Sequence, residues 1–237
     1  MCYCNVIESS IARDSNFVLP IHCGPEIGVA STKAFLGQIL VLYILALKLG
    51  SLRNEIEKKK YQDKIKDLKD LPKLIEKTLL HDNDIQAISS TFNEVKGSMF
   101  LGRGYSYPIA LEGALKLKEL SYVHAEGYPA GEMKHGPIAL LDKKVPVISI
   151  ASPGEVFDKV ISNAQEAKAR DSYLIGIAPE CNGTEIFDYL MKVPSTNELI
   201  SPLLNILPLQ LLSYHIAAHR GLDVDQPRNL AKSVTVE

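Results

Sequence analysis

Three consecutive segments decide the fold: VPVISIAS (145–152), VFDKVISNAQEAKAR (156–170) and YLIGIAP (173–179). The first and the third are short and continuously apolar, which is typical of strands buried on both faces. The middle segment repeats its apolar residues at helical spacing. A strand, a helix and a strand in this order predict two parallel strands joined by a crossover helix, which is the α/β class.

The same alternation continues on both sides of these segments. SMFLGRG (98–104) and DYLMKVPS (188–195) are predicted strands, and residues 108–122 and 201–221 are predicted helices. We therefore predict a three-layer α/β/α domain with a parallel sheet at residues 97–222, followed by a polar tail at 223–237. Ligands of such sheets bind beyond the carboxyl ends of the strands, where the loop 102–107 falls. Its GxG sequence fits a phosphate site and, equally, a tight turn.

The N-terminal region is expected to open inside another sheet. FVLPIHCG (17–24) has the pattern of a strand, and residues 33–49 have that of a long helix ending at Gly50. The most apolar part of this helix, 35–47, is shorter than a bilayer span, so a buried helix is predicted. We expect residues 1–50 to be the C-terminal part of a domain. Residues 51–96 are a predicted charged helical connector, which Pro72 divides into two helices.

Composition narrows the function classes. With 237 residues, 46% of them hydrophobic, the chain can bury a core, and a formal charge of -2 offers no basic field for nucleic acid. The N-terminus does not have the pattern of a signal peptide. The four cysteines, Cys2, Cys4, Cys23 and Cys181, form no CxxC pair, which favours a reducing compartment. We expect a cytoplasmic protein that binds neither nucleic acid nor membrane.

Acids and bases gather on the predicted helix 109–122 and after it. Glu112, Lys116 and Glu119 lie at i, i+4 and i+7, so they share a face, either as a surface ladder of ion pairs or as a catalytic carboxylate with a neighbouring ammonium. HAEGYPAGEMKHGP (124–137) follows. This segment is polar and interrupted by glycine and proline, so it is either an exposed connection or part of a site. Its ligand types suit zinc or iron, but the spacing HxE…ExxH matches no helical ligand pair.

Two further residues are candidate nucleophiles. Lys232 lies in NLAKSVTVE among small and apolar residues. A lysine in a dry crevice loses proton affinity and forms a Schiff base with a carbonyl, whereas a lysine near a terminus is usually solvated. Cys2 would be an N-terminal thiol nucleophile if Met1 were removed, but no glycine-rich sheet sequence follows it.

The chain resembles a known family over three segments: GPEIGVASTKAF (24–35), residues 100–142 from FLGRGYSYPIALEG to HGPIALLD, and DVDQPRNLAKSVTVE (223–237). These are similar to the isomerase part of the glutamine-fructose-6-phosphate aminotransferase (glucosamine-6-phosphate synthase) family. The resemblance implies two sugar-isomerase (SIS) domains, each with a five-stranded parallel sheet, in an oligomer with shared sites. This chain would hold the end of the first SIS domain and all of the second, without the glutaminase domain and without the Ser/Thr-rich phosphate loop.

The resemblance also implies roles for individual residues. Glu119 would be the base that moves a proton between C1 and C2 of the sugar, and Lys116 its helper. His135 would be the ring-opening acid/base, lent by a neighbouring subunit. Lys232 would form the imine with the ketose, Ala231 would line the site, and Val6 would contact the sugar by its backbone. Ile7 and Glu8 depart from the family pattern, and Glu8 would repel a phosphosugar.

The expected function is conversion of fructose 6-phosphate to glucosamine 6-phosphate by imine formation and proton transfer, on the route to UDP-N-acetylglucosamine, with no cofactor and no metal. The expected partners are phosphosugars, a second copy in a homodimer that shares His135, and a separately encoded N-terminal fragment. The alternatives are a phosphosugar-binding SIS module without turnover and an inactive truncated product. Because the first 50 residues would expose a sheet edge, we expect association or instability.

Overall fold

The structure is a computed structural model and describes residues 1–232. The chain forms two compact units. Unit 1 contains Met1–Asp70 and the C-terminal segment from Arg228, and unit 2 contains Leu71–Pro227. The boundary lies inside one helix, α3 (Lys58–Leu79).

Unit 2 is built on a five-stranded parallel sheet. Its strands are β3 (Gly97–Gly102), β4 (His124–Pro129), β5 (Val147–Ile150), β6 (Leu174–Ala178) and β7 (Tyr189–Lys192), in the order β4-β3-β5-β6-β7. Strands β5, β6 and β7 fall inside the apolar runs that predicted them, and β3 begins one residue before its predicted run. The α/β class and the parallel sheet are confirmed.

Strand β4 was not predicted, because the sequence from His124 to Pro129 is polar and rich in turn residues. It pairs with β3 in register from Gly97–His124 to Gly102–Pro129 and forms the edge of the sheet. An edge strand keeps one side open to solvent, so polar residues are compatible with it. Gly127 also lets this strand approach helix α5 (Ser106–Ser121), since a Cβ there would lie 3.0 Å from Leu111. Two short 3-10 helices, η2 (Ala130–His135) and η3 (Pro137–Leu140), follow the strand.

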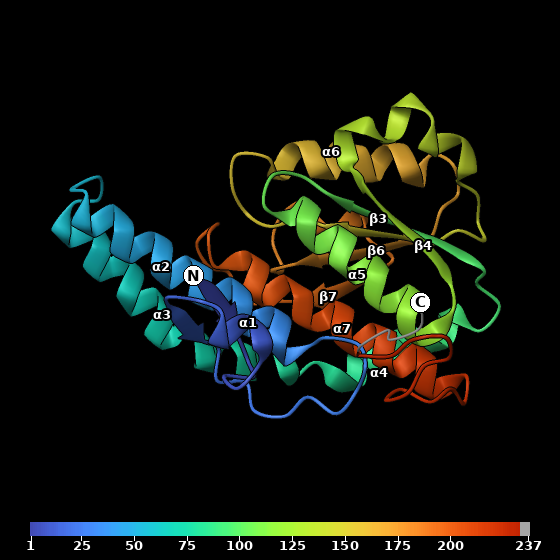
Figure 1. The fold of residues 1–237 in the computed structure, drawn as a ribbon. Helices are drawn as coiled ribbons and strands as arrows, with labels where there is room; N and C mark the ends of the chain where they lie inside the picture. Colours follow the sequence, from blue (N-terminus) through green and yellow to red (C-terminus); the bar gives the residue numbers. More distant parts are fainter. Residues whose placement is uncertain (233–237) are drawn as a thin grey trace. The chain divides into compact units, whose positions relative to one another are not determined.

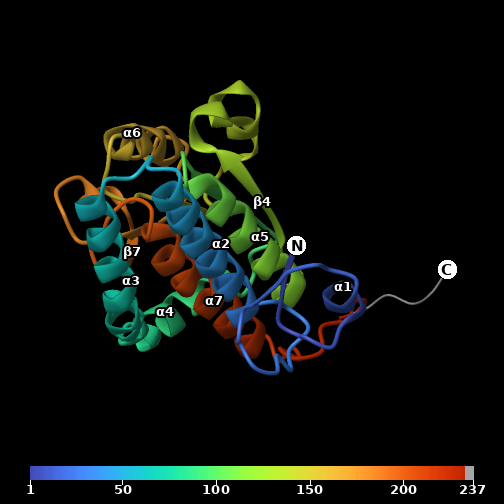
Figure 2. The same cartoon turned by 60° about the vertical axis from the view of Figure 1, so that its left-hand side comes forward.

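Helices cover both faces of this sheet. Three helices pack together on one face: α4 (Asp82–Ser89), α5 (Ser106–Ser121) and α7 (Ser201–His219). Helix α6 (Phe157–Lys168) lies on the other face with η2, and Figures 1 and 2 both show α5 beside α7. Side chains of β3 alternate between the layers: Met99 and Leu101 join the α6 core, and Phe100 meets Gly113 of α5. This is the predicted α/β/α sandwich.

Unit 1 contains a much smaller sheet. Strands β1 (Cys2–Cys4) and β2 (Val18–Pro20) pair in parallel, with the one-turn helix α1 (Ser10–Arg13) between them. Helix α2 (Lys33–Leu52) follows and lies beside the first turns of α3 in both views (Figures 1 and 2). The start of α2 agrees with the prediction.

Two expectations for this region are wrong. Helix α2 was expected to be buried, but only Leu47 among its 20 residues is buried. It is also the one helix of residues 1–232 that is long and apolar enough to cross a membrane by length and composition. Pro72 was expected to break the connector into two helices, but α3 runs through it to Leu79. Proline removes one backbone hydrogen bond, but the helix continues on both sides of Pro72. The unit boundary falls two residues before this proline.

Candidate functional site

Helix α5 assembles three charged residues on one half-buried face. The turn before it requires glycine: Gly104 has φ of +52°, and a Cβ on Gly102 would lie 2.3 Å from the Ser106 carbonyl oxygen. From this start, α5 runs back along the sheet and ends at Tyr122, which adopts the left-handed conformation. Helical spacing then places Glu112, Lys116 and Glu119 on one side, as predicted.

Lys116 lies between the two carboxylates. Its Nζ donates a hydrogen bond to Glu119 Oε2 at 2.6 Å and lies 3.3 Å from Glu112 Oε1. The Lys116 side chain is only 2% exposed, against 14% for Glu112 and 22% for Glu119. A solvated ladder of ion pairs would leave all three exposed, so this cluster is a desolvated charge network.

The protonation of Glu112 reflects this burial. Desolvation raises the pKa of Glu112 above its usual value; the Lys116 ammonium opposes the rise, and the negative charge of Glu119 adds to it. The cluster holds two acids and one base, so one negative charge remains in a partly dry place when all three are ionised. A carboxylate in such an environment is suited to accept and return a proton near neutral pH.

His135 lies far from Glu119 along the sheet. Glu119 is in the last turn of α5, next to the start of β4, where His124 pairs with the first residue of β3. His135 follows the carboxyl end of β4, and a strand of six residues spans about 17 Å. The His135 side chain is exposed at the end of η2. One copy of unit 2 therefore does not bring His135 to Glu119.

Lys232, Ala231 and Val6 belong to unit 1. Lys232 and Ala231 are exposed, and the residues that follow them, 233–237, lie outside the described residues. The positive charge of Lys232 is near enough to Glu26 to favour its ionised form. Val6 is also exposed.

Glu26 is a residue that the sequence did not single out. Its Oε1 accepts hydrogen bonds from the Thr32 amide at 2.8 Å, the Thr32 hydroxyl at 3.1 Å and the Ala34 amide at 3.3 Å, which caps the start of α2. Burial opposes ionisation of Glu26, but these hydrogen bonds and Lys232 outweigh it, so the pKa of Glu26 is lowered. The charge of Lys232 therefore acts on the loop that carries Glu26.

Asn5 fixes the other end of this loop. Its Nδ2 donates to the Gly24 carbonyl at 2.6 Å, and its Oδ1 accepts from the Cys23 amide at 2.9 Å. Val6 follows Asn5 directly. The predicted residues therefore divide into two groups, with Glu119, Lys116 and His135 in unit 2 and the others in unit 1. The sequence did contain a signal for Glu26, because this residue lies in the GPEIGVASTKAF motif.

The metal interpretation gains no support from the geometry. His124 lies 3.4 Å from Glu126, and Glu126 accepts a hydrogen bond from the Tyr128 hydroxyl. Within residues 1–232, no three histidine, cysteine, aspartate or glutamate side chains gather as a possible ligand set. Cys2, the other candidate nucleophile, is buried in β1.

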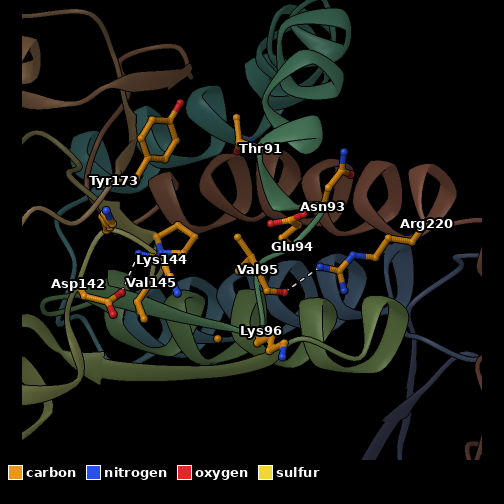
Figure 3. A pocket seen from close by; sticks show the side chains of 13 residues that line it. Thr91, Asn93, Glu94, Val95, Lys96, Asp142, Lys144, Val145, Tyr173 and Arg220 are labelled. Carbon is orange, nitrogen blue, oxygen red and sulfur yellow. Dashed lines mark hydrogen bonds between the residues drawn. The ribbon is translucent and has the colours of Figure 1, made fainter.

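A separate cavity of about 910 Å³ lies at the amino ends of β3, β5 and β6. Figure 3 shows it, with Arg220 reaching toward the Val95 carbonyl. Arg220 donates hydrogen bonds to the carbonyls of Phe92, Val95 and Ser121. Burial lowers the pKa of Arg220. None of the predicted site residues lines this cavity, and its arginine serves to hold three chain segments together.

Residues 92–220 match the model of the SIS domain. The chain belongs to the SIS domain family. This SIS chain is 57% identical over 97% of its length to glutamine–fructose-6-phosphate aminotransferase (isomerising) of Synechocystis, and covers 37% of that protein. It is 51% identical to the corresponding Bacteroides thetaiotaomicron protein over 99% of its length, covering 38% of it. The SIS chain thus spans a little more than a third of these relatives.

Solved structures agree with this assignment. The C-terminal domain of glucosamine-fructose-6-phosphate aminotransferase from Francisella tularensis superimposes with a TM-score of 0.92 at 43% identity, covering 95% of the SIS chain and 64% of that domain. Glucosamine-6-phosphate deaminase from Thermotoga maritima has a TM-score of 0.71 at 24% identity, covering 98% of this chain and 65% of that one. At that identity the second likeness shows the fold alone.

Proposed function

We propose that this SIS chain is the isomerase module of an amino-sugar synthase of the glutamine–fructose-6-phosphate aminotransferase type, converting fructose 6-phosphate to glucosamine 6-phosphate. The similarity to that enzyme over nearly the whole chain supports this. The observation that carries the proposal is the buried Lys116 ammonium between Glu112 and Glu119. A charge network of this kind costs stability, so its presence on a half-buried face indicates chemistry.

In the proposed reaction, the Lys232 amine attacks the C2 carbonyl of the open-chain ketose and loses water to form an imine. Ammonia then displaces the lysine, so the nitrogen stays on C2. Glu119 takes a proton from C1 and a proton is returned to C2, while the imine nitrogen gains a proton and the C1 hydroxyl loses one, so that an amine stands at C2 and an aldehyde at C1. Lys116 donates a hydrogen bond to Glu119 and orients it, and Glu112 holds Lys116 in place. No metal or organic cofactor is required by these steps.

His135 is assigned to ring opening in the site of a second copy, because it lies at the opposite end of the sheet from Glu119 in its own subunit. This makes a homodimer part of the proposal. A cytoplasmic location is proposed on the strength of the relatives and of the four free cysteines.

A second candidate function is phosphosugar binding without turnover. The exposed position of Lys232 favours it for the chain by itself, because lysines that form Schiff bases act from desolvated pockets. The same chain could then turn over once another polypeptide excludes water from the lysine.

A turnover assay distinguishes between the two candidate functions. Conversion of fructose 6-phosphate to glucose 6-phosphate, and ammonia-dependent formation of glucosamine 6-phosphate, are measured for the chain alone and with the part of the Synechocystis relative that it does not match. We expect turnover in the second case, and its loss in Glu119→Gln and Lys232→Ala. Lys118→Ala, on the exposed side of α5, and Lys58→Ala are the matched controls. Absence of turnover in both cases, with binding unaffected by Lys232→Ala, would contradict the proposed isomerase.

A further inference from the structure

The cavity at the amino ends of β3, β5 and β6 has no part in the proposed reaction. Its volume of about 910 Å³ lies in the range of about 300–1,000 Å³ that is usual for sites of small organic ligands. Its walls are the segment 91–97 before β3, the segment 142–146 before β5, Tyr173 before β6, and Arg220 after α7. All of these residues belong to unit 2, so the whole lining lies within one unit.

Hydrogen bonds hold these walls in place. Arg220 donates to the Val95 carbonyl at 2.8 Å and to the Ser121 carbonyl at 3.2 Å, which joins the first wall to the end of α5. The Ser98 hydroxyl donates to the Pro146 carbonyl at 3.0 Å, which joins β3 to the second wall. The cavity is therefore largely preformed, so a ligand loses little free energy to ordering it.

The charges of the lining are not balanced. Two of its side chains are acidic and four are basic: Glu94, Asp142, Lys96, Lys143, Lys144 and Arg220. Within residues 1–232, none of these side chains takes part in an ion pair. Asp142 is engaged in its own turn, because its Oδ1 accepts a hydrogen bond from the Lys144 amide at 2.7 Å. Four positive charges against two negative ones leave an excess of two, which favours an anionic ligand.

Arg220 shows the need for an anion most clearly. Its guanidinium is half-buried, and its hydrogen bonds go to backbone carbonyls, which carry no net charge. Burial lowers the pKa of Arg220, because the charged form is less well solvated in the cavity than in water. A negative charge in the cavity would stabilise this cation.

One end of the cavity also offers a planar apolar surface. The half-buried ring of Tyr173 is held by the ring of Tyr189, whose centroid lies 5.6 Å away at an interplanar angle of 58°. Val145 lines the same cavity. Figure 3 shows Tyr173 and Lys144 at one end and Arg220 at the other. A flat apolar group can therefore pack on Tyr173 while an anionic group meets the lysine.

We propose that this cavity binds a small phosphomonoester with a planar apolar body. A phosphomonoester carries about 1.5 to 2 negative charges at neutral pH, which matches the excess of positive charge, whereas a carboxylate carries only one. The planar body packs on Tyr173, and the phosphate oxygens accept hydrogen bonds from Lys143 and Lys144. This binding does not depend on the proposed isomerase function, since neither Glu119 nor Lys232 lines the cavity.

The test uses the whole 237-residue chain, with naphthyl phosphate as the probe. The chain contains no tryptophan, so the emission of the naphthyl group can be followed against little protein background, and its anisotropy gives Kd. Naphthol supplies the ring without the charge, naphthoate supplies one charge, and inorganic phosphate supplies the charge without the ring. We expect naphthyl phosphate to bind roughly tenfold more tightly than each of these. In NMR spectra, the amides of 93–97 and 142–146 should shift, and those of 102–107 should not.

Variants locate the site. Lys143→Ala combined with Lys144→Ala should weaken binding roughly tenfold. Lys118→Ala combined with Lys159→Ala is the matched control, because it removes two exposed lysines elsewhere in unit 2, and it should bind as the parent does. Glu94→Gln should tighten binding severalfold, because it removes a negative charge from the cavity. Damage to the fold would not produce tighter binding.

Four results would overturn the inference. The first is the absence of binding at every soluble concentration of the probe. The second is naphthol binding as tightly as naphthyl phosphate, which would leave an apolar crevice without an anion site. The third is a set of amide shifts confined to 102–107, which would place the probe at the carboxyl ends of the strands. The fourth is displacement of the probe by fructose 6-phosphate.

The proposed isomerase function fails or succeeds separately. Lys232→Ala should bind naphthyl phosphate as the parent does, although it cannot form an imine. Loss of turnover with unchanged probe binding would therefore concern the reaction alone, and loss of probe binding with unchanged turnover would concern the cavity alone.

Discussion

Helices α2 and α7 are alike in apolar composition and length but differ in their surroundings. Both are long, apolar on all sides and placed after a parallel strand pair, yet one buried residue in α2 stands against thirteen in α7. The apolar composition of a helix therefore indicates that the helix needs apolar neighbours, but it does not show whether those neighbours are present. The stability of the two units can therefore be compared by making the same kind of substitution in each.

The largest expected effect is a charge placed in each helix. Leu204 of α7 is fully buried. Leu204→Glu should destabilise unit 2 by more than about 4 kcal/mol, because an unpaired charge would be buried. Leu42→Glu in α2 should change stability by less than about 0.5 kcal/mol, as exposed substitutions do. Urea unfolding followed by circular dichroism measures both. Equal losses for the two variants would show that α2 is already covered.

The next effect concerns the charge network of unit 2. Lys116→Met keeps the volume of the side chain but leaves Glu112 and Glu119 facing each other without a cation. A loss of about 3 kcal/mol is expected, because a partner of buried charges is removed. The pKa of Glu112, already raised by burial, should rise further, which NMR titration of the carboxyl carbon detects. Lys118→Met, on the exposed side of α5, is the control and should leave both quantities unchanged.

A smaller effect is expected where Arg220 holds three carbonyls of unit 2. Arg220→Met keeps the aliphatic stem but removes these charged donors, and a loss of about 2 kcal/mol is expected from the unpaired carbonyls. Arg170→Met, at an exposed position on the same unit, serves for comparison. A loss as small as that of Arg170→Met would show that water replaces the guanidinium in the cavity.

The smallest effect concerns Glu26, which caps α2 in unit 1. Glu26→Gln should cost about 1 kcal/mol at neutral pH, as the loss of a helix cap does. Since its folded pKa is lowered, the stabilisation is present above the ordinary value of 4.5 and is lost as the pH falls through the lowered pKa. The parent and Glu26→Gln should therefore converge in acid. Urea midpoints at a series of pH values test this, and a difference that persists in acid would exclude the charge as its cause.

Much of the fold follows from local patterns. Continuous apolar runs bounded by turn residues predict β3, β5, β6 and β7, and helical periodicity predicts the helices between them. Strand β4 could not be predicted in this way, since its pairing with β3 is a contact between distant segments and its own residues are polar. The burial of α2 was predicted wrongly because burial depends on neighbours. Pro72 was expected to end a helix that the surrounding turns in fact continue.

The candidate site, like the fold, could be predicted only where local sequence spacing determines it. Helical spacing alone places Glu112, Lys116 and Glu119 together, but their burial depends on the sheet and α7. The separation of His135 from Glu119 follows from the length of β4, which the sequence did not reveal. The electrostatic interaction of Glu26 with Lys232 links residues more than 200 positions apart, and no local pattern reports it.

Covalent trapping at Lys232 tests the proposed function most directly. The chain is incubated with fructose 6-phosphate and cyanoborohydride, alone and with the part of the Synechocystis relative that it does not match as a probe, and peptides are analysed by mass spectrometry. The predicted result is a reduced sugar adduct on Lys232 that forms mainly when the probe is present and is absent in Lys232→Ala. An adduct spread over many surface lysines, or no adduct on Lys232 in the complex, would contradict the account.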